Sequence, residues 1–354
     1  MARGWLPPVY GSRSRLFILI QGFFRTPQGL DRYRRRVHRP VPPPAASLHH
    51  LHSRDSSGAL FAGGALLLTI AGFWLSSRAS LVPWLMGQAV LGVAFVQWFA
   101  LLHECGHFTL FRRRRLNSLA GHAAGLCALI PFGMWTYIHR QHHKWTGWQD
   151  LDPTTATLTP QPRGALQRTL VNIAWRLWLP LFSSVYRLTN FWNPGRMARG
   201  LRSGELRWPA VAEGLACLAF YAFAVWQIGA LTTLRLVGLA LLIAFVIEDV
   251  LILSQHTHVP MELSHGRPVL PHRALAQERY TRSLRLPAPA SWLLLHFDAH
   301  ELHHMYPFVP GYDLRRIDYA PENEVGWWAW LRGARALPGD VLLFQNRHDT
   351  GFDL

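Results

Sequence analysis

Apolar residues gather in four long runs, and each run is about as long as a helix that crosses a membrane. The runs cover residues 59–75, 81–102, 209–231 and 233–253. Short turns join the first run to the second and the third to the fourth, so the pattern predicts two helical hairpins. We therefore expect an all-α integral membrane protein with four transmembrane helices, interfacial helices and a histidine-rich cytoplasmic cap.

Histidine clusters follow the apolar segments. HECGH (103–107) continues the second run, HRQHH (139–143) follows a shorter apolar stretch at 119–135, and HELHH (300–304) lies far downstream. On a helix, residues three or four positions apart share one face, so each cluster can direct its imidazoles to a single point. The three clusters can therefore build a metal site together.

A shared site requires all three clusters to lie on the same side of the membrane. If residues 119–135 crossed completely, HRQHH would lie opposite HECGH. We therefore expect this stretch to be a re-entrant or interfacial helix, with His122 a packed polar residue. Residues 170–188, interrupted by Arg176, Pro180 and Arg187, are expected to be amphipathic and interfacial.

The pattern divides the chain into an Arg- and Pro-rich arm (1–58), a membrane domain (59–317) and a C-terminal tail (318–354), within a polar region that begins at residue 254. In the arm, the apolar piece 16–24 is too short to span, and no small-residue cleavage site follows it. A transit peptide remains an alternative, because no acid precedes Asp31. The LHHLH segment (48–52) is expected to be interfacial, without a metal role.

Composition supports the membrane assignment. Half of the 354 residues are hydrophobic, 16% are charged, and the formal charge is +16. Of the 36 basic residues only Arg78 and Arg235 fall at the turns of the predicted hairpins. This distribution follows the positive-inside rule, so it predicts that the clusters and both termini are cytoplasmic, and it argues against nucleic-acid binding. Three cysteines in or beside apolar runs imply no disulfide framework.

Nine imidazoles are candidate ligands, which is too many for one metal ion and suits two. They are His103, His107, His139, His142, His143, His256, His300, His303 and His304. His256 is preferred over His258 because Asp249 lies seven residues earlier on nearly the same helical face and could orient it. We expect Asp249, Asp152 and His258 beside the ligands. Imidazole alone does not identify the metal.

The pattern His-Glu-x-x-His also occurs in zinc metalloproteases, where the Glu is the general base, and this chain contains it twice. A zinc protease needs only one copy of this pattern, and its site would give HRQHH no role. The protease remains a weaker alternative on these grounds.

The three clusters, with QHTH (255–258) and HHMYPFVPGYDL (303–314), resemble the histidine boxes of the membrane fatty-acid desaturases. The resemblance is to the acyl-lipid, Δ12-like branch and covers roughly residues 59–317. The acyl-CoA branch carries an Asn one turn before the last His of the fourth span, where this chain has Ile252 or Ser254.

This resemblance implies that the histidines hold two iron ions, which activate O₂ with two electrons to desaturate an acyl chain. Relatives with similar boxes hydroxylate or ketolate alkanes and carotenoids, so another di-iron oxygenase is the alternative. The chain lacks a Rossmann glycine fingerprint and a fused b-type cytochrome motif. A separate ferredoxin or b-type cytochrome is therefore expected as donor, and the arginines of the tail are one candidate docking face.

Overall fold

The computed structural model describes residues 41–160 and 162–346. Most of the predicted Arg- and Pro-rich arm, including the apolar piece at 16–24, lies outside the described residues. From Pro44 onward the chain forms one compact unit. This unit is mostly helical, and within the described residues a single small sheet pairs β1 (Leu284–Arg285) in parallel with β2 (Val325–Gly326).

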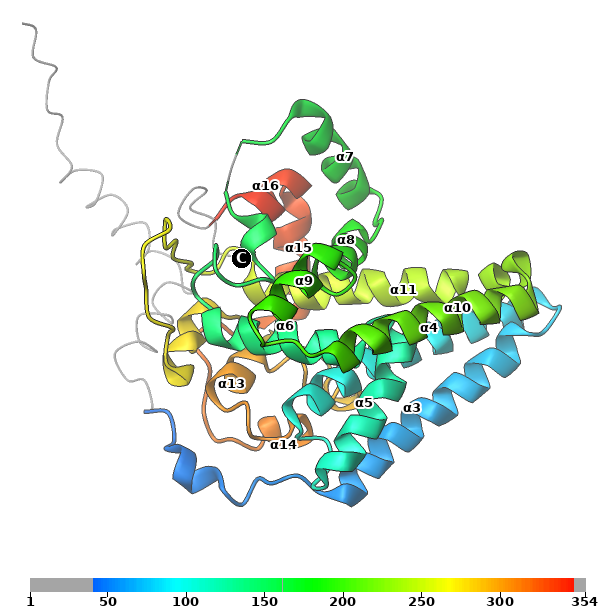
Figure 1. Cartoon of the computed structure of the whole chain (residues 1–354), viewed down its shortest axis with the longest axis horizontal. Coiled ribbons are helices and arrows are strands. Elements are labelled where there is room, and N and C mark those ends of the chain that lie inside the picture. The colour runs from blue at the N-terminus through cyan, green and yellow to red at the C-terminus, as the bar shows by residue number, and fades with distance from the viewer. Residues whose placement is uncertain (1–40, 161, 347–354) are drawn as a thin grey trace, which may run out of the picture. The chain divides into compact units, whose positions relative to one another are not determined.

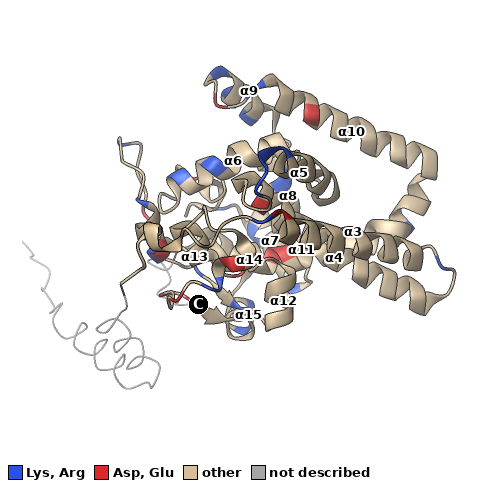
Figure 2. Cartoon of the chain, turned by 90° about the horizontal axis from the view of Figure 1, so that it is seen from below, with Lys and Arg blue, Asp and Glu red and all other residues tan. Residues whose placement is uncertain are grey.

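Four helices in this unit are long and apolar enough to cross a membrane, in agreement with the number predicted. They are α3 (Asp55–Ser76), α4 (Leu81–His107), α10 (Trp208–Ile228) and α11 (Ala230–His256). At about 1.5 Å per residue, each is long enough for a hydrocarbon core of about 30 Å. Helices α3, α4 and α11 pack against one another, and α10 contacts α11. Figure 1 shows the four helices, and Figure 2 shows that they carry few charged residues.

Helix α4 is the central element, because it packs against α3, α5 and α11. Small residues allow close contact: a Cβ on Gly72 would lie 2.6 Å from Leu91, and one on Gly92 would lie 2.7 Å from Ile243. The buried amide of Gln88 accepts a hydrogen bond from the backbone N–H of Ala240 at 2.9 Å. These contacts fix α4 against α3 and α11, and both α4 and α11 end in histidines.

The apolar stretch predicted at 119–135 is not one helix. It belongs to α5 (Arg114–Ala128) and α6 (Phe132–Trp145), which are bent by 95° relative to each other. The carboxylate of Glu213 accepts hydrogen bonds from the backbone N–H groups of Phe132 and Gly133, at 2.8 Å each, which satisfies the start of α6. Such a bend suits a re-entrant segment or a broken span, so α5 and α6 together could also count as a fifth crossing.

Three short helices, α7 (Ala165–Arg176), α8 (Leu181–Asn190) and α9 (Pro194–Arg202), precede α10. The first two are amphipathic as predicted, with exposed leucines such as Leu166, Leu170 and Leu188. On the buried side of α8, Arg187 forms an ion pair with Glu248 of α11 at 2.5 Å. The interfacial segment is thus joined to the fourth long helix.

The expectation of a polar tail after residue 254 is wrong for its described part, which is folded. It contains η3 (Ala274–Tyr280), α12 (Ala288–Leu293), α13 (His300–Met305), α14 (Gly311–Leu314), α15 (Trp327–Ala336) and α16 (Gly339–Phe344). Trp330 and Leu342 are each 1% exposed, and α16 packs against α7. The apolar residues of this region are scattered along its sequence, so no long apolar run predicted a buried core here. Two further short 3-10 helices are η1 (Ala45–Leu48) and η2 (Ala156–Leu158).

Candidate metal centre

The structure brings the nine predicted histidines together in two groups. In each group the candidate ligand atoms lie within 4.8 Å of one another. The first group contains His103, His107, His139, His143 and His303, and the second contains His142, His256, His300 and His304. The prediction that these nine side chains converge is confirmed, whereas their binding of metal stays a prediction.

Four helices supply the two groups, and helical periodicity explains how each cluster is divided. His103 and His107 lie one turn apart at the end of α4, and both enter the first group. On α6, His139 and His143 face the first group, while His142 is rotated toward the second. The cluster on α13 is divided in the same way, so α6 and α13 bridge the two groups.

The imidazole nitrogens approach one another at distances that suit a shared ion. In the first group, Nε2 of His139 lies 2.7 Å from Nε2 of His107 and 3.2 Å from Nε2 of His143. In the second, Nε2 of His300 lies 2.9 Å from that of His256 and 3.0 Å from that of His304. Two imidazoles bound to one ion at about 2.1 Å, at right angles, have nitrogens about 3.0 Å apart.

Tautomers give a second reason to place a cation here. His142 donates its Nδ1–H to Asp152, and His304 donates its Nδ1–H to Gln277, so Nε2 is the nitrogen of each ring whose lone pair is left to bind an ion. These two Nε2 atoms face each other at 3.2 Å. Two lone pairs at this distance repel unless a cation lies between them. The residues therefore fit a metal ion.

Burial and the neighbouring imidazoles hold the pKa of His300, His303 and His304 well below the ordinary histidine value. Their rings are therefore neutral at physiological pH and can bind a cation. Nε2 of His103 is also buried and has no hydrogen-bond partner among the described residues, so this atom is available to the first group.

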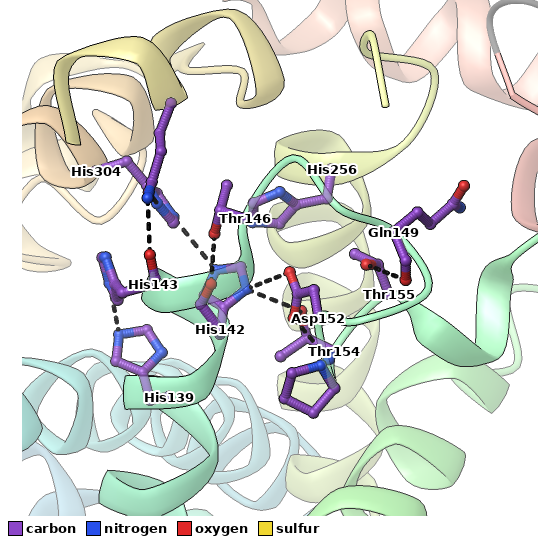
Figure 3. A network of polar contacts seen from close by, with 12 residues as sticks. His139, His142, His143, Thr146, Gln149, Asp152, Thr154, Thr155, His256 and His304 are labelled. Carbon is purple, nitrogen blue, oxygen red and sulfur yellow. Dashed lines mark hydrogen bonds and ion pairs between the residues drawn. The ribbon is translucent and has the colours of Figure 1, made fainter. Parts of the chain in front are cut away.

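Asp152 lies beside the ligands, as predicted, and holds His142 (Figure 3). Its Oδ2 accepts the Nδ1–H of His142 at 2.7 Å, and its Oδ1 accepts from the backbone N–H of Thr154 at 2.8 Å. Burial opposes the charge of Asp152, but the His142 imidazole and the hydrogen bonds outweigh it and lower the pKa of the carboxyl. The carboxylate stays ionised and fixes the ring orientation.

Gln277 of η3 has a similar role that the sequence did not indicate. Its Oε1 accepts from Nδ1 of His304 at 2.8 Å, and its Nε2 donates to the backbone carbonyl of His143 at 2.7 Å. One buried amide thus joins the second and third clusters. A single Gln in a polar segment carries no periodic or charge signal, so only the fold reveals it.

Both glutamates of the His-Glu-x-x-His patterns have hydrogen-bond partners other than the ligand atoms that converge in the two groups. Glu104 accepts from the Nδ1–H of His103 at 3.2 Å and from the backbone N–H of Gly311 at 2.7 Å. Glu301 accepts from the backbone N–H groups of Ser283, at 3.1 Å, and Asn323, at 2.6 Å. A protease base must instead reach the water on the metal, so this arrangement argues against the protease.

The predicted role of Asp249 is wrong. Its Oδ1 accepts a hydrogen bond from the backbone N–H of Ser183 at 2.6 Å, and in the described part of the chain no hydrogen bond joins it to His256. The carboxylate satisfies the start of α8, a demand that helical spacing within α11 could not reveal.

The other predicted histidines lie outside both groups. His258 follows the end of α11 and contacts the carbonyl of Val341 through Nε2 at 3.2 Å. His122 is paired with Glu213 at 2.7 Å. The histidines of LHHLH make only local contacts, as in that between Nδ1 of His50 and the carbonyl of Ser47. None of these takes part in the two described groups.

Comparison with known proteins gives one consistent family. A family model described as fatty acid desaturase matches residues 79–330, which include all three clusters. An sn-1 oleoyl-lipid 12-desaturase of Picosynechococcus sp. is 26% identical, over 70% of this chain and 75% of the relative. A chloroplastic temperature-sensitive sn-2 acyl-lipid omega-3 desaturase (ferredoxin) of Arabidopsis thaliana is 26% identical, over 66% of this chain and 55% of the relative.

A third relative, a delta(12) fatty acid desaturase of Caenorhabditis elegans, is 27% identical, over 52% of this chain and 50% of the relative. The aligned parts therefore span from half to three quarters of these relatives' own lengths.

Proposed function

Because the chain belongs to the fatty acid desaturase family, a family of oxidoreductases, we propose that it introduces a double bond into a membrane acyl lipid at a centre of two iron ions. The observation that carries this proposal is the convergence of nine imidazoles in two groups bridged by α6 and α13. The names of the relatives, which are acyl-lipid and fatty acid desaturases, support the same substrate class.

The reaction balances with an external reductant. A –CH₂–CH₂– unit, one O₂, two electrons and two protons give –CH=CH– and two molecules of water. O₂ accepts four electrons, of which two come from the C–H bonds that break and two from a donor protein. Iron, when bound, supplies the activation of O₂ and the removal of hydrogen from an unactivated methylene.

The chain's own residues hold and orient that centre. The neutral imidazoles offer their nitrogens, while Asp152, Gln277 and Glu104 each fix a histidine through its other nitrogen. All three of these orienting side chains are buried, at 4% exposure or less. Burial excludes bulk water, which would otherwise protonate reactive species and loosen the ligands.

The membrane arrangement is part of the proposal. We infer two hairpins, α3 with α4 and α10 with α11, with the metal centre and both termini on the cytoplasmic side. Two observations support this: all nine histidines gather at the ends of α4 and α11 remote from Arg78 and Arg235, and the other 34 basic residues lie outside the turns.

Lipid analysis tests the proposed reaction. The full chain is expressed in a bacterial host whose membrane lipids lack polyunsaturated chains, together with a plant-type ferredoxin and its reductase. The expected result is acyl chains two mass units lighter, with a new double bond. A gain of one oxygen atom would instead identify a hydroxylase, and unchanged lipids with two bound irons would contradict the proposed substrate.

A further inference from the structure

The outward face of α6 lines two adjoining hollows, of about 720 Å³ and about 180 Å³. Tyr137, Gln141 and Glu205 line both, so the hollows form one groove that we call the α6 groove. Its walls come from α6, α9 and the start of α10.

The α6 groove is strongly basic, as Figure 2 indicates by the blue residues on α6 and α9. Its basic lining residues are Arg140, Lys144, Arg196, Arg199 and Arg207. Two carboxylates oppose them, and that of Glu213 is already used by His122 and by the start of α6. The groove therefore has an excess of positive charge.

Four of these cations are free of carboxylates. Arg140, Lys144, Arg199 and Arg207 are exposed, and among the described residues none of them forms an ion pair. Three arginines of the C-terminal region differ, because carboxylates already pair with them. Arg315 pairs with Asp298 and with Glu324, which also binds Arg285, and Arg316 pairs with Asp313.

The groove lies on the back of the helix that carries three candidate ligands. Residues of α6 that face the groove alternate with His139, His142 and His143, which face the two groups. Gln141, in the groove, is covalently bonded to His142. An α-helix is about 10 Å in diameter with side chains, so little more than its backbone separates the groove from the ligands.

Resting on the proposed function, we propose that the α6 groove is the docking surface of the electron donor, a small protein with an acidic surface. The donor loses one electron at each visit, and two visits supply the two electrons that the reaction requires. The unpaired cations attract an acidic partner and orient it, and the thin wall of α6 keeps the transfer path short.

The same charge could attract anionic lipid, but the apolar surface argues against a membrane-facing groove. Helices α7 and α8 expose many large apolar side chains, whereas no residue of α9 is among the exposed large apolar residues of the described chain. A helix that lies on a membrane needs such an apolar face. Helix α9 is instead suited to an aqueous, acidic protein surface.

The test measures binding directly. The full chain, in nanodiscs of neutral phosphatidylcholine, is titrated with a purified plant-type ferredoxin, whose surface is acidic. We expect Arg199→Glu and Arg207→Glu each to weaken the ferredoxin Kd about tenfold and to reduce its salt dependence. Arg332→Glu reverses an equally exposed charge on α15 and should leave the Kd unchanged.

Unchanged ferredoxin affinity in both groove variants would overturn the docking proposal. So would a loss of binding to vesicles containing anionic phosphatidylglycerol with ferredoxin affinity retained, because the groove would then serve the membrane. The lipid assay distinguishes failure of the docking proposal from failure of the proposed function. Unaltered lipids, together with ferredoxin binding that depends on Arg199, would contradict the proposed desaturation of membrane lipids and support the docking surface.

Discussion

At the scale of residues, the centre depends on what each imidazole does with its second nitrogen. One histidine of each cluster is fixed this way, namely His103 by Glu104, His142 by Asp152 and His304 by Gln277. A fixed ring loses little freedom when it binds an ion, so these hydrogen bonds strengthen metal binding. Within the described part of the chain, the Nδ1 atoms of His300 and His303 have no hydrogen-bond partner.

The glutamates and the histidines should respond differently to substitution. Glu104→Gln keeps an acceptor for the Gly311 N–H, so iron content should stay near that of the wild type. His142→Ala removes a ligand, and one iron per chain should be lost. Metal analysis of the two purified variants checks this. Full iron in His142→Ala, combined with loss of activity in Glu104→Gln, would instead favour a glutamate general base.

His256 and His258 provide a matched pair. We expect His256→Ala to lose iron from the second group, because its Nε2 lies 2.9 Å from that of His300. His258→Ala should retain both irons, because that ring contacts the carbonyl of Val341 instead. Iron quantification on both variants decides, and retention of both irons without His256 would show the choice of ligand to be wrong.

At the scale of elements, the long helices were predictable and the bend was not. A helix that crosses a membrane needs about 20 apolar residues, and a run of that length can be recognised in the sequence. The bend lies at Leu129, which adopts a φ of 58°, and at Pro131, which precedes the first residue of α6. Pro131 is a visible signal that a helix ends there, but the 95° angle and the contact with Glu213, more than 80 residues away, have no signal in the apolar pattern. Contacts between residues far apart in the sequence also explain why the role of Gln277 and the contact of Asp249 with Ser183 could not be predicted.

The ion pair between Arg187 and Glu248 should be important for stability because both side chains are buried, at 4% and 1% exposure. Arg187→Met leaves an unpaired buried carboxylate and should cost about 3–5 kcal/mol. The double variant Arg187→Met with Glu248→Leu should recover much of that loss. Thermal unfolding in detergent measures both, and a double variant no more stable than Arg187→Met would contradict this account.

At the scale of the whole molecule, segments nearly 200 residues apart meet at one centre. HECGH and HELHH can meet only if an even number of crossings separates them, a condition that could be stated from the sequence. The pairing of α6 with α13, and the division of these two clusters between the two groups, depended on rotations about helix axes that the sequence does not specify.

Topology can be read with fused reporters. A reporter fused after His143 should report the cytoplasm, and one inserted at Arg78 should report the opposite side, because α3 and α4 are expected to cross as a hairpin. Alkaline phosphatase and green fluorescent protein fusions give complementary signals. A fusion after His143 that reports the periplasm would place the second cluster away from the first and remove the shared centre.

The metal content of the purified wild-type chain tests the central claim most directly, because we propose that the two groups of imidazoles hold two iron ions. Mass spectrometry of the elements, with the protein concentration determined by amino-acid analysis, gives the number of each metal per chain. The account predicts two irons per chain and no stoichiometric zinc. A single zinc per chain, with no iron after expression in iron-replete medium, would contradict it.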